Sequence, residues 1–494
     1  MKKNIIANIL GRFWSILSNF LFIPLYIKFL GFDSYSVISF TLMIAGIMAI
    51  LDGGLTATLS REFARKDTNE KEKNKVFNTL ETCYLIIVVL TIAIVFFSSS
   101  FIANHWVNVK HFSPDKISYF IKIISFEIGF QLLFRFYSGG LLGLEKQVEA
   151  NMYQIGWGIT RNAMILIPLL YYPRLDVFFI WQAVATFIFT IIIKLSLQKK
   201  LGQKLGAFSL KIDKRVLHNV GKFAGGMMLI ALVSALNTQL DKITISKLLS
   251  LDNLGYYTLA VSLSQGLIIL VNPITTALLP RLTAHYSFGE KEKASSIFRE
   301  ASILISVIMF SIMLTMAFFA KDLVWIWTGD LKIAEKTYLL VPIVLFSYCM
   351  IALQMLPYHV AIANGSTKIN NVLGILSLII TIPGYLIFTE KYRAIGAASV
   401  FCAVQTITTF IYFYYINRQF LDLKFFKDIL LKRFILPLFV ATTVVFLFKL
   451  IPNIFQHNRI LDLLWIGLCL CLTLIITLPI FVSLKKIGTF LQKK

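Results

Sequence analysis

Long apolar segments alternate with short polar ones along almost the whole chain. A helix needs about 20 mainly apolar residues to cross the hydrocarbon core of a bilayer, and fourteen segments reach about that length. We predict that each is a helix, because a backbone inside lipid must satisfy its hydrogen bonds within its own segment. The predicted spans cover residues 9–30, 36–59, 81–103, 118–142, 151–172, 176–196, 221–246, 254–279, 300–320, 337–362, 369–389, 394–416, 434–451 and 461–483.

The composition excludes a soluble protein. Hydrophobic residues make up 57% of the 494 residues and charged residues only 15%, whereas soluble domains contain roughly 45–50% apolar and about 25% charged residues. A chain this apolar has too little polar surface to enclose its own core in water. We therefore predict an all-α integral membrane protein.

The charge distribution predicts the orientation in the membrane. The net charge of +23 comes from basic residues that gather between apolar segments, for example at Lys199, Lys200 and Lys204. That placement is typical of contacts with anionic lipid and of the excess of Lys and Arg in cytoplasmic loops, and it does not indicate nucleic acid. With a cytoplasmic N-terminus, the cytoplasmic segments hold about 32 of the 48 basic residues and the opposite side about 11. Both termini are therefore expected in the cytoplasm.

An internal repeat divides the chain. Residues 54–73 and 274–293 share an Arg, at positions 61 and 281, and end in the same Glu-Lys-Glu-Lys run. Because six spans separate the two copies, the halves face the same way, as parallel repeats do, and the substrate is expected to pass between them. The predicted domains are a six-helix lobe at 1–197, a basic cytoplasmic linker at 198–220, a second six-helix lobe at 221–420 and an extra helix pair at 421–494.

Polar residues recur at helical spacing inside several predicted spans. Glu127, Gln131 and Arg135 lie four residues apart on the fourth span, so they share one face. Such faces cannot point at lipid, because charges at membrane depth cost about 2.5–3.5 kcal/mol. We expect them to line a wet cavity. The candidate substrate-binding residues are Arg135, Arg161, Lys222, Glu127, Gln131, Asn151, Gln154, Asn237 and Asn272.

The cations among these candidates suit an anionic ligand. Guanidinium binds phosphate in a bidentate manner and ammonium as a point charge, so Arg135, Arg161 and Lys222 are hypothesised to hold an anionic headgroup. A structural alternative is pairing within the membrane, such as Glu127 with Arg135. Lys222 has its own alternative, which is to extend toward the interface as a boundary lysine.

Three further residues are candidates for coupling transport to an ion. Asp52 precedes two glycines in the second span, Asp241 lies on the seventh and His359 on the tenth. Each also has a structural interpretation: a buried carboxylate for Asp52, an interfacial ion pair with Lys242 for Asp241, and a helix-contact histidine for His359.

Enzyme signatures do not occur in the sequence. It contains no phosphate-binding loop, no dinucleotide fingerprint and no nucleophile elbow. The five cysteines lie in apolar stretches without ligand spacing. We therefore expect no cofactor, no metal site and no enzymatic activity, and transport driven by a proton or sodium gradient or by the membrane potential.

Two segments carry a family resemblance. GFDSYSVISFTL followed by LDGGLTATLSRE resembles the N-terminal signature of polysaccharide transporters in the multidrug/oligosaccharidyl-lipid/polysaccharide exporter (MOP) superfamily. LNTQLDKITISKLLSLDNLGYYTLAVSL resembles the counterpart in their second half. The chain is most similar to O-antigen flippases of the Wzx type, although Ser36 stands where the family commonly has Gly. The resemblance implies a MATE-like fold, with two six-helix lobes around a V-shaped cavity.

The resemblance also implies a function. The implied substrate is an undecaprenyl-pyrophosphate-linked oligosaccharide, an O-antigen or capsular repeat unit, moved from the inner to the outer leaflet of the bacterial cytoplasmic membrane by alternating access. Polymerase and chain-length proteins are the implied partners, and nucleic acid is not among them. Two alternatives stay open: an ion-coupled multidrug exporter of the same superfamily, and a membrane glycosyltransferase or polymerase. The extracytoplasmic loops at 104–117 and 321–336 are short for the latter.

Overall fold

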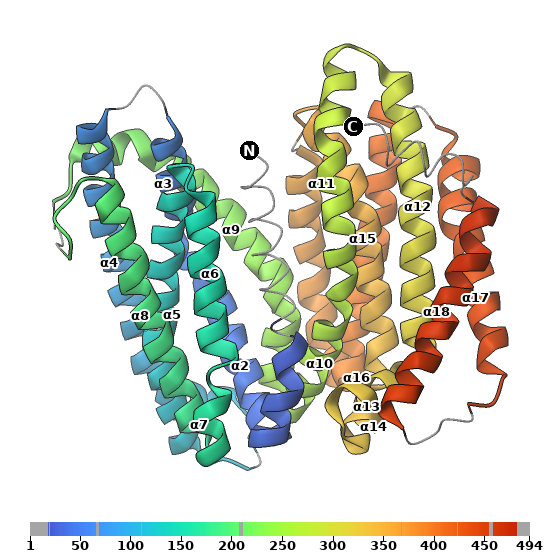
Figure 1. Ribbon diagram of the computed structural model, residues 1–494, viewed down its shortest axis with the longest axis horizontal. Coiled ribbons are helices and arrows are strands. Elements are labelled where there is room, and N and C mark those ends of the chain that lie inside the picture. The colour runs from blue at the N-terminus through green and yellow to red at the C-terminus, as the bar shows by residue number, and fades with distance from the viewer. Residues whose placement is uncertain are drawn as a thin grey trace. The chain divides into compact units, whose positions relative to one another are not determined.

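The protein is almost entirely helical in the computed structural model (Figure 1). The structure describes residues 18, 20–65, 69–109, 111–206, 211–366, 368–421, 423–453 and 458–481, without the side chains of residues 219, 222–224, 229 and 230. Within this part of the chain no strand forms, and the only extended pairing is an isolated bridge between Asn108 and Ser250. Eleven of the described helices are long and apolar enough to cross a membrane. The predicted all-α membrane fold is confirmed.

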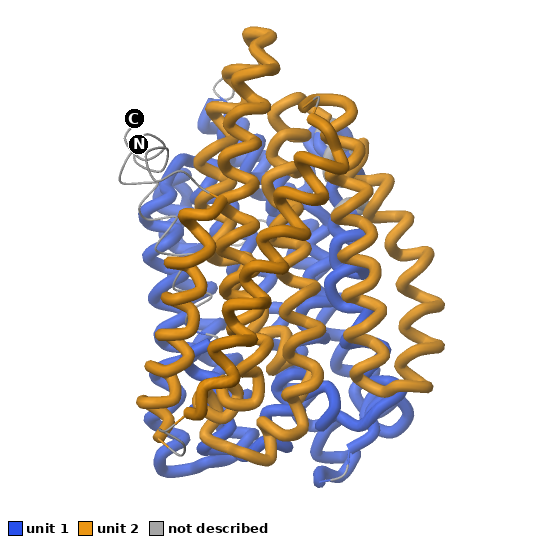
Figure 2. The backbone as a smooth tube through the Cα atoms, turned by 90° about the vertical axis from the view of Figure 1, so that its right-hand side faces the viewer, with its two compact units in different colours: residues 1–255 blue, residues 256–494 orange. Residues whose placement is uncertain are grey.

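The chain folds into two compact units, which Figure 2 distinguishes by colour. The first is Met1–Gly255 and the second Tyr256–Lys494. The described elements of the first unit are a helix at Phe20–Leu30, α2 (Phe32–Met48), η1 (Ala49–Asp52), α3 (Leu55–Ala64), α4 (Glu70–Phe101), η2 (Ile102–Trp106), α5 (Pro114–Gly143), α6 (Gln147–Asn162), α7 (Leu166–Tyr171), α8 (Leu175–Lys200), α9 (Lys214–Leu248) and the start of α10 (Leu251–Ser264).

Helix α5 is the centre of the first unit. It packs against α3, α4, α6 and α8, and 72% of its most apolar stretch is buried, the largest share among the candidate spans. Its start is fixed by Ser113, whose side chain accepts from the backbone N–H of Lys116, and by Pro114, whose missing N–H costs nothing in the first turn. Helix α4, by contrast, exposes large apolar side chains such as Val89 and Phe97, as a lipid-facing helix does.

The second unit is built around α15. This helix packs against α11, α12 and α16, and the last two helices, α17 and α18, pack against α12. The described elements of this unit are the remainder of α10, α11 (Gly266–Ser287), α12 (Lys291–Phe318), α13 (Ala320–Thr328), α14 (Leu331–Thr337), α15 (Leu340–Ala363), α16 (Lys368–Ile416), η3 (Asn417–Leu421), η4 (Phe425–Ile435), α17 (Leu436–Lys449) and α18 (Arg459–Phe481).

Helix α16 contains two of the predicted spans, 369–389 and 394–416. They meet at Arg393, whose backbone is left-handed (φ 56°, ψ −143°) and interrupts the helix. Gly396 follows, and a Cβ on this residue would overlap the carbonyl oxygen of Phe388. The tight connection between the two spans therefore requires glycine at this position.

Three other predicted spans differ from the structure. The fifth, 151–172, is divided into α6 and α7 by a break after Asn162, so neither piece is long enough to cross a bilayer by itself. The first, 9–30, lies partly outside the described residues, and its described part is the apolar helix Phe20–Leu30. The second, 36–59, ends at Asp52 in the structure, because Gly53 and Gly54 interrupt the helix and its last residues belong to α3. The other predicted spans each correspond to a long apolar helix or, in α16, to half of one.

Helix α9 packs with the first unit. Along its length it contacts α2, η1, α3 and α4. At the C-terminal end of α9, Ser246 Oγ accepts from Trp106 Nε1 (3.1 Å), and Lys247 Nζ donates to the carbonyl of His105 (2.7 Å). The N–H of Leu251, at the start of α10, donates to the carbonyl of Asn108 (3.1 Å).

The compact units thus divide after Gly255, whereas the sequence repeat places the second lobe at 221–420. The other predicted domain boundaries were derived from the sequence repeat, and the packing of the helices does not test them: the lobe at 1–197, the linker at 198–220 and the helix pair at 421–494. They stay predictions.

Candidate functional site

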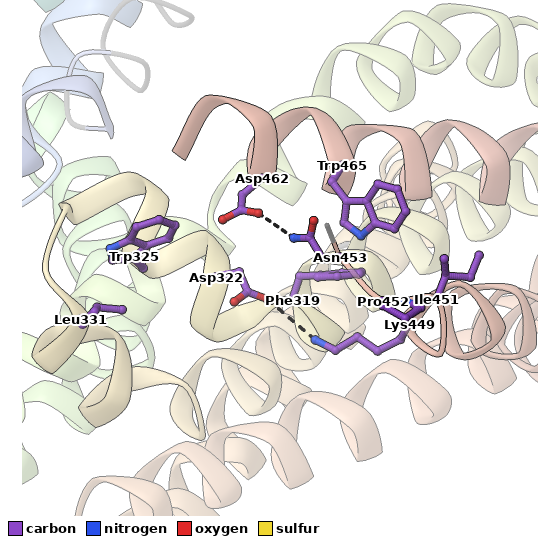
Figure 3. Close-up of a pocket in the computed structure, with 10 residues that line it drawn as sticks. All are labelled: Phe319, Asp322, Trp325, Leu331, Lys449, Ile451, Pro452, Asn453, Asp462 and Trp465. Carbon is purple, nitrogen blue, oxygen red and sulfur yellow. Dashed lines mark hydrogen bonds and ion pairs between the residues drawn. The ribbon is translucent and has the colours of Figure 1, made fainter. Parts of the chain in front are cut away.

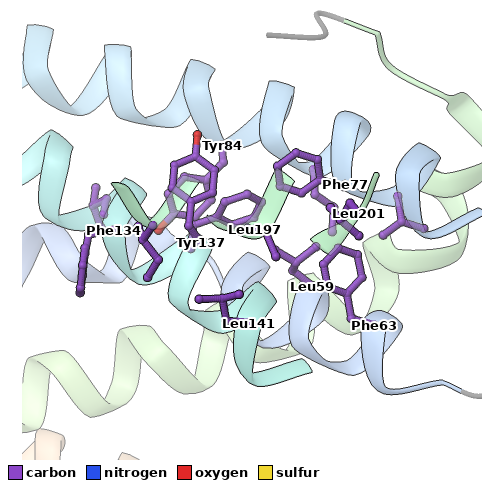
Figure 4. Close-up of a cluster of buried hydrophobic side chains, with 14 of the residues drawn as sticks. Leu59, Phe63, Phe77, Tyr84, Phe134, Tyr137, Leu141, Leu197 and Leu201 are labelled. Atoms are coloured by element: carbon purple, nitrogen blue, oxygen red, sulfur yellow. The ribbon is translucent and has the colours of Figure 1, made fainter. Parts of the chain in front are cut away.

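A continuous apolar cluster joins α3, α4, α5 and α8 and fixes the side chains around it (Figure 4). Tyr84 of α4 stacks on Phe136 of α5, with ring centroids 4.5 Å apart. Gly143 lets α5 approach α3 closely, because a Cβ there would lie 2.5 Å from the carbonyl oxygen of Ser60. Polar groups on α5 are therefore held by a rigid surrounding rather than by a loop.

Glu127 and Arg161 form a nearly buried ion pair. Glu127 Oε1 lies 2.6 Å from Arg161 Nη2, and the side chains are only 7% and 16% exposed. Gln131 Nε2 also donates to Glu127 Oε1 (2.6 Å). Gln182 of α8 accepts from Arg161 Nε and donates to the Arg161 carbonyl (3.0 Å). The structure thus brings three predicted site residues together, but as a neutral cluster.

The surroundings of Arg135 differ from those of Arg161. Its side chain is exposed, and it makes no ion pair or hydrogen bond with any residue that the structure describes. Nearby, the hydroxyl of Tyr84 donates to Asp52 Oδ1 (2.7 Å), and Thr56 Oγ1 donates to the same oxygen. Asp52 is thus stabilised by two hydroxyl donors, and Arg135 pairs with none of the described carboxylates.

A third polar group escaped the sequence analysis. Lys194 Nζ of α8 lies 3.2 Å from Glu81 Oε1 of α4, and Tyr137 Oη of α5 donates to the same oxygen (2.8 Å). The two charged side chains are only 7% and 1% exposed. In the sequence both flank long apolar runs, so they look like boundary residues. Only the packing of α5 against both α4 and α8 reveals that they are buried together.

The other candidates in the first unit make local contacts. Asn151 Nδ2 donates to the carbonyl of Gln147 (2.7 Å), and Asn237 Nδ2 donates to that of Val233 (2.9 Å). Asp241 is buried and its Oδ1 accepts from the backbone N–H of the next residue (2.7 Å). Gln154 is half-buried. The side chain of Lys222 lies outside the described residues.

The candidates in the second unit also contact their own helices. Asn272 Oδ1 accepts from Thr276 Oγ1 (3.1 Å). His359 is buried, and its Nδ1 is 2.8 Å from the carbonyl of Met355, one turn earlier. Both interpretations of His359, coupling and structural, stay predictions. Among the described residues, no three His, Cys, Asp or Glu side chains come together as ligands for a metal ion.

These features define a class: a multi-pass helical membrane protein of the transporter type, with polar groups held inside its spans. The chain belongs to the family described as "Polysaccharide biosynthesis protein", whose model matches residues 1–285. A second family model, MatE, matches residues 226–387. Both place the protein in the MOP superfamily, as the resemblance predicted.

Individual relatives agree with this assignment. The chain is 22% identical over 378 residues to a Shigella flexneri protein named "Putative O-antigen transporter", covering 75% of this chain and 86% of that one. The fold of the present chain is similar to that of the lipid II flippase MurJ in an inward closed conformation, with a TM-score of 0.75 and 16% identity. The similarity covers 97% of the present chain and 99% of MurJ. An inward-facing multidrug resistance MATE transporter has a TM-score of 0.66 at 13% identity, with 82% and 94% covered. The MATE-like fold is confirmed.

Proposed function

We propose that the protein is a flippase that moves an undecaprenyl-pyrophosphate-linked oligosaccharide from the inner to the outer leaflet of the bacterial cytoplasmic membrane by alternating access. The family and the Shigella flexneri relative support the substrate class. The oligosaccharide is an O-antigen or capsular repeat unit, and the lipid tail stays in the bilayer while the polar part crosses.

The exposed Arg135, which pairs with none of the described carboxylates, carries the proposal. An exposed guanidinium on a membrane-spanning helix is unfavourable against lipid, so its exposed side faces water or ligand. A pyrophosphate offers the bidentate acceptor geometry that guanidinium prefers. Of the two arginines predicted to hold the headgroup, Arg135 remains available, whereas Arg161 is neutralised by Glu127.

The lipid-linked intermediate tests the proposal. Depletion of the protein should cause an undecaprenyl-pyrophosphate-linked oligosaccharide to accumulate in the inner leaflet, where a membrane-impermeant glycosidase applied from the outside does not reach it. Restoring the wild-type gene should return the oligosaccharide to the outer face. If the lipid-linked pool is unchanged in amount and sidedness after depletion, the proposal is wrong.

A second candidate is an ion-coupled multidrug exporter, which the MatE match at residues 226–387 favours. Substrates of such exporters are mostly cationic, and an exposed arginine repels them. Expression in a drug-sensitive host decides between the two. A flippase leaves the resistance profile unchanged, whereas an exporter raises resistance to cationic drugs.

A further inference from the structure

A pocket of about 450 Å³ lies at one end of the second unit. It is formed by α13, by the segment that follows α17 and by the first turns of α18 (Figure 3). Its volume lies within the range of about 300–1,000 Å³ that is usual for small-ligand sites. Nothing in the transport site described above uses it.

The pocket combines aromatic rings with carboxylates and an amide. Trp325 and Trp465 lie at its two ends in Figure 3, with Asp322, Asp462 and Asn453 between them. Phe319 also lines the pocket, but it is only 5% exposed. Trp325 is half-buried, and its indole N–H makes no hydrogen bond with any described residue, so the N–H can donate to a ligand.

The two carboxylates differ in their surroundings. Asp462 is buried and its Oδ1 accepts from Asn453 Nδ2 (2.6 Å). Asp322 is 46% exposed, and its Oδ2 lies 3.8 Å from Lys449 Nζ, beyond hydrogen-bond distance. Lys449 Nζ instead donates to the carbonyl of Phe318 (2.7 Å) and sits 4.3 Å from the centre of the Phe319 ring. Asp322 thus forms a long ion pair with Lys449, and its 46% exposure still presents carboxylate oxygen to a ligand.

The frame of the pocket is fixed by Arg459. Its Nε donates to the carbonyl of Ile326 (3.0 Å), which ties the start of α18 to α13. Gly329 ends α13 in a left-handed conformation (φ 78°), and a Cβ on it would lie 3.0 Å from Arg459 Nη1. The pocket is thus built from segments far apart in the sequence that are joined by specific hydrogen bonds.

We infer that this pocket is a carbohydrate-binding site that holds a sugar ring of an oligosaccharide. The faces of a sugar ring carry C–H groups, which pack favourably on the electron-rich faces of aromatic rings. Its hydroxyl groups both donate and accept, and thus match the carboxylates of Asp322 and Asp462 and the amide of Asn453. Two carboxylates and one lysine give no excess of positive charge, so a pyrophosphate is not the ligand.

The location suggests where the sugar comes from. Five of the residues that line the pocket fall in loops that the predicted orientation places outside the cytoplasm, at the membrane face to which a flippase delivers its cargo: Asp322, Trp325, Leu331, Pro452 and Asn453. This origin of the sugar rests on the proposed function, whereas the binding chemistry of the pocket does not. A sugar held here would delay return of the oligosaccharide to the transport site.

The test measures binding of free oligosaccharide to the full-length protein in nanodiscs. The probe is the oligosaccharide that mild acid releases from the lipid-linked pool of the cells that make the protein. Its binding is measured by tryptophan fluorescence and by calorimetry. Trp325→Ala and Asp322→Asn should each raise the Kd about tenfold or more. Trp327→Ala on the same helix is the matched control, because Trp327 does not line the pocket, and it should keep the wild-type Kd.

Arg135→Ala separates this inference from the proposed function, because the probe carries neither pyrophosphate nor lipid. That variant should bind the free oligosaccharide with the wild-type Kd even where transport is lost. Absence of binding by the wild type, or binding that the two pocket variants leave unchanged, overturns the inference. Should Trp325→Ala fail to fold, Asp322→Asn decides by itself.

Discussion

Glu127 forms its ion pair with Arg161 of the neighbouring helix α6, at 2.6 Å, and not with Arg135, which lies about two turns away on its own helix. Spacing along α5 alone offers Arg135 as a same-face partner. The contact across helices neutralises one of the two predicted headgroup-binding arginines and leaves the other charged and exposed. The two residues should therefore respond differently to substitution.

Replacing Arg161 should destabilise the protein more than it alters substrate recognition. Arg161→Met leaves the buried carboxylate of Glu127 unpaired, which costs about 3–5 kcal/mol. The measurement is the midpoint of unfolding in detergent or nanodiscs. The double variant Glu127→Gln with Arg161→Met should recover much of the loss. Equal destabilisation in the single and double variants would show that the pair is not the cause.

Replacing Arg135 should reduce transport and leave the stability of the protein nearly unchanged. Arg135→Ala removes no described ion pair or hydrogen bond, so the unfolding midpoint should change little. Delivery of the lipid-linked oligosaccharide to the outer face should fall at least tenfold, because the cation for the pyrophosphate is lost. Arg135→Lys should retain part of the activity as a point charge. Wild-type delivery by correctly inserted Arg135→Ala would remove this residue from the site.

Gly396→Ala should disrupt the connection inside α16. The new Cβ would overlap the carbonyl oxygen of Phe388, and relief of such overlap costs about 1–3 kcal/mol. Gly467→Ala in α18 is the control, because nothing lies within 4 Å of its Cβ position. It should stabilise slightly, since alanine is the better helix former. Comparable melting temperatures for the two variants would argue against the close approach.

The stability contributed by Asp322 should depend on pH. Burial raises the pKa of Asp322 above its usual 3.8, and Asp462 adds to the effect, whereas Lys449 and Lys321 oppose it. A carboxyl with a raised pKa stabilises the fold at pH below 3.8, and this contribution is lost as the pH rises through the raised pKa. Asp322→Asn should therefore raise the melting temperature at neutral pH and not near pH 3.5. An equal change in melting temperature at both pH values would contradict this explanation.

The predicted orientation gives a labelling pattern. In a background with the five cysteines replaced by alanine, Lys332→Cys should react with a membrane-impermeant maleimide in intact cells. Lys291→Cys should react only after permeabilisation. Both positions are exposed, so accessibility to solvent is matched. The reverse pattern would invert the topology.

Apolar patterning was sufficient to predict most of the helices, because a membrane span needs a long apolar run whatever its partners are. It failed for the span predicted at 151–172, where the break after Asn162 interrupts a segment of adequate overall hydrophobicity. The connection at Arg393 was predicted within a few residues, yet its strained geometry was not. Backbone conformation at a single position depends on the contacts that enforce it.

The site was less predictable than the fold. Helical spacing placed Glu127, Gln131 and Arg135 on one helix, and Gln131 does contact Glu127. Spacing cannot tell which residue on another helix completes an ion pair, so Arg161 and Arg135 looked alike. For the same reason the pairing of Glu81 with Lys194 was not predicted, because each residue lies beside a long apolar run and resembles a boundary residue.

The attachment of α9 to η2 bears on where one compact unit ends and the next begins. The predicted repeat places α9 in its second copy, yet hydrogen bonds from Trp106 to Ser246 and from Lys247 to His105 join it to η2, which lies in the first copy. The boundary between the predicted repeats and the boundary between the compact units therefore lie at different places in the chain. The covalent connection between the compact units is α10, and not the basic linker at 198–220.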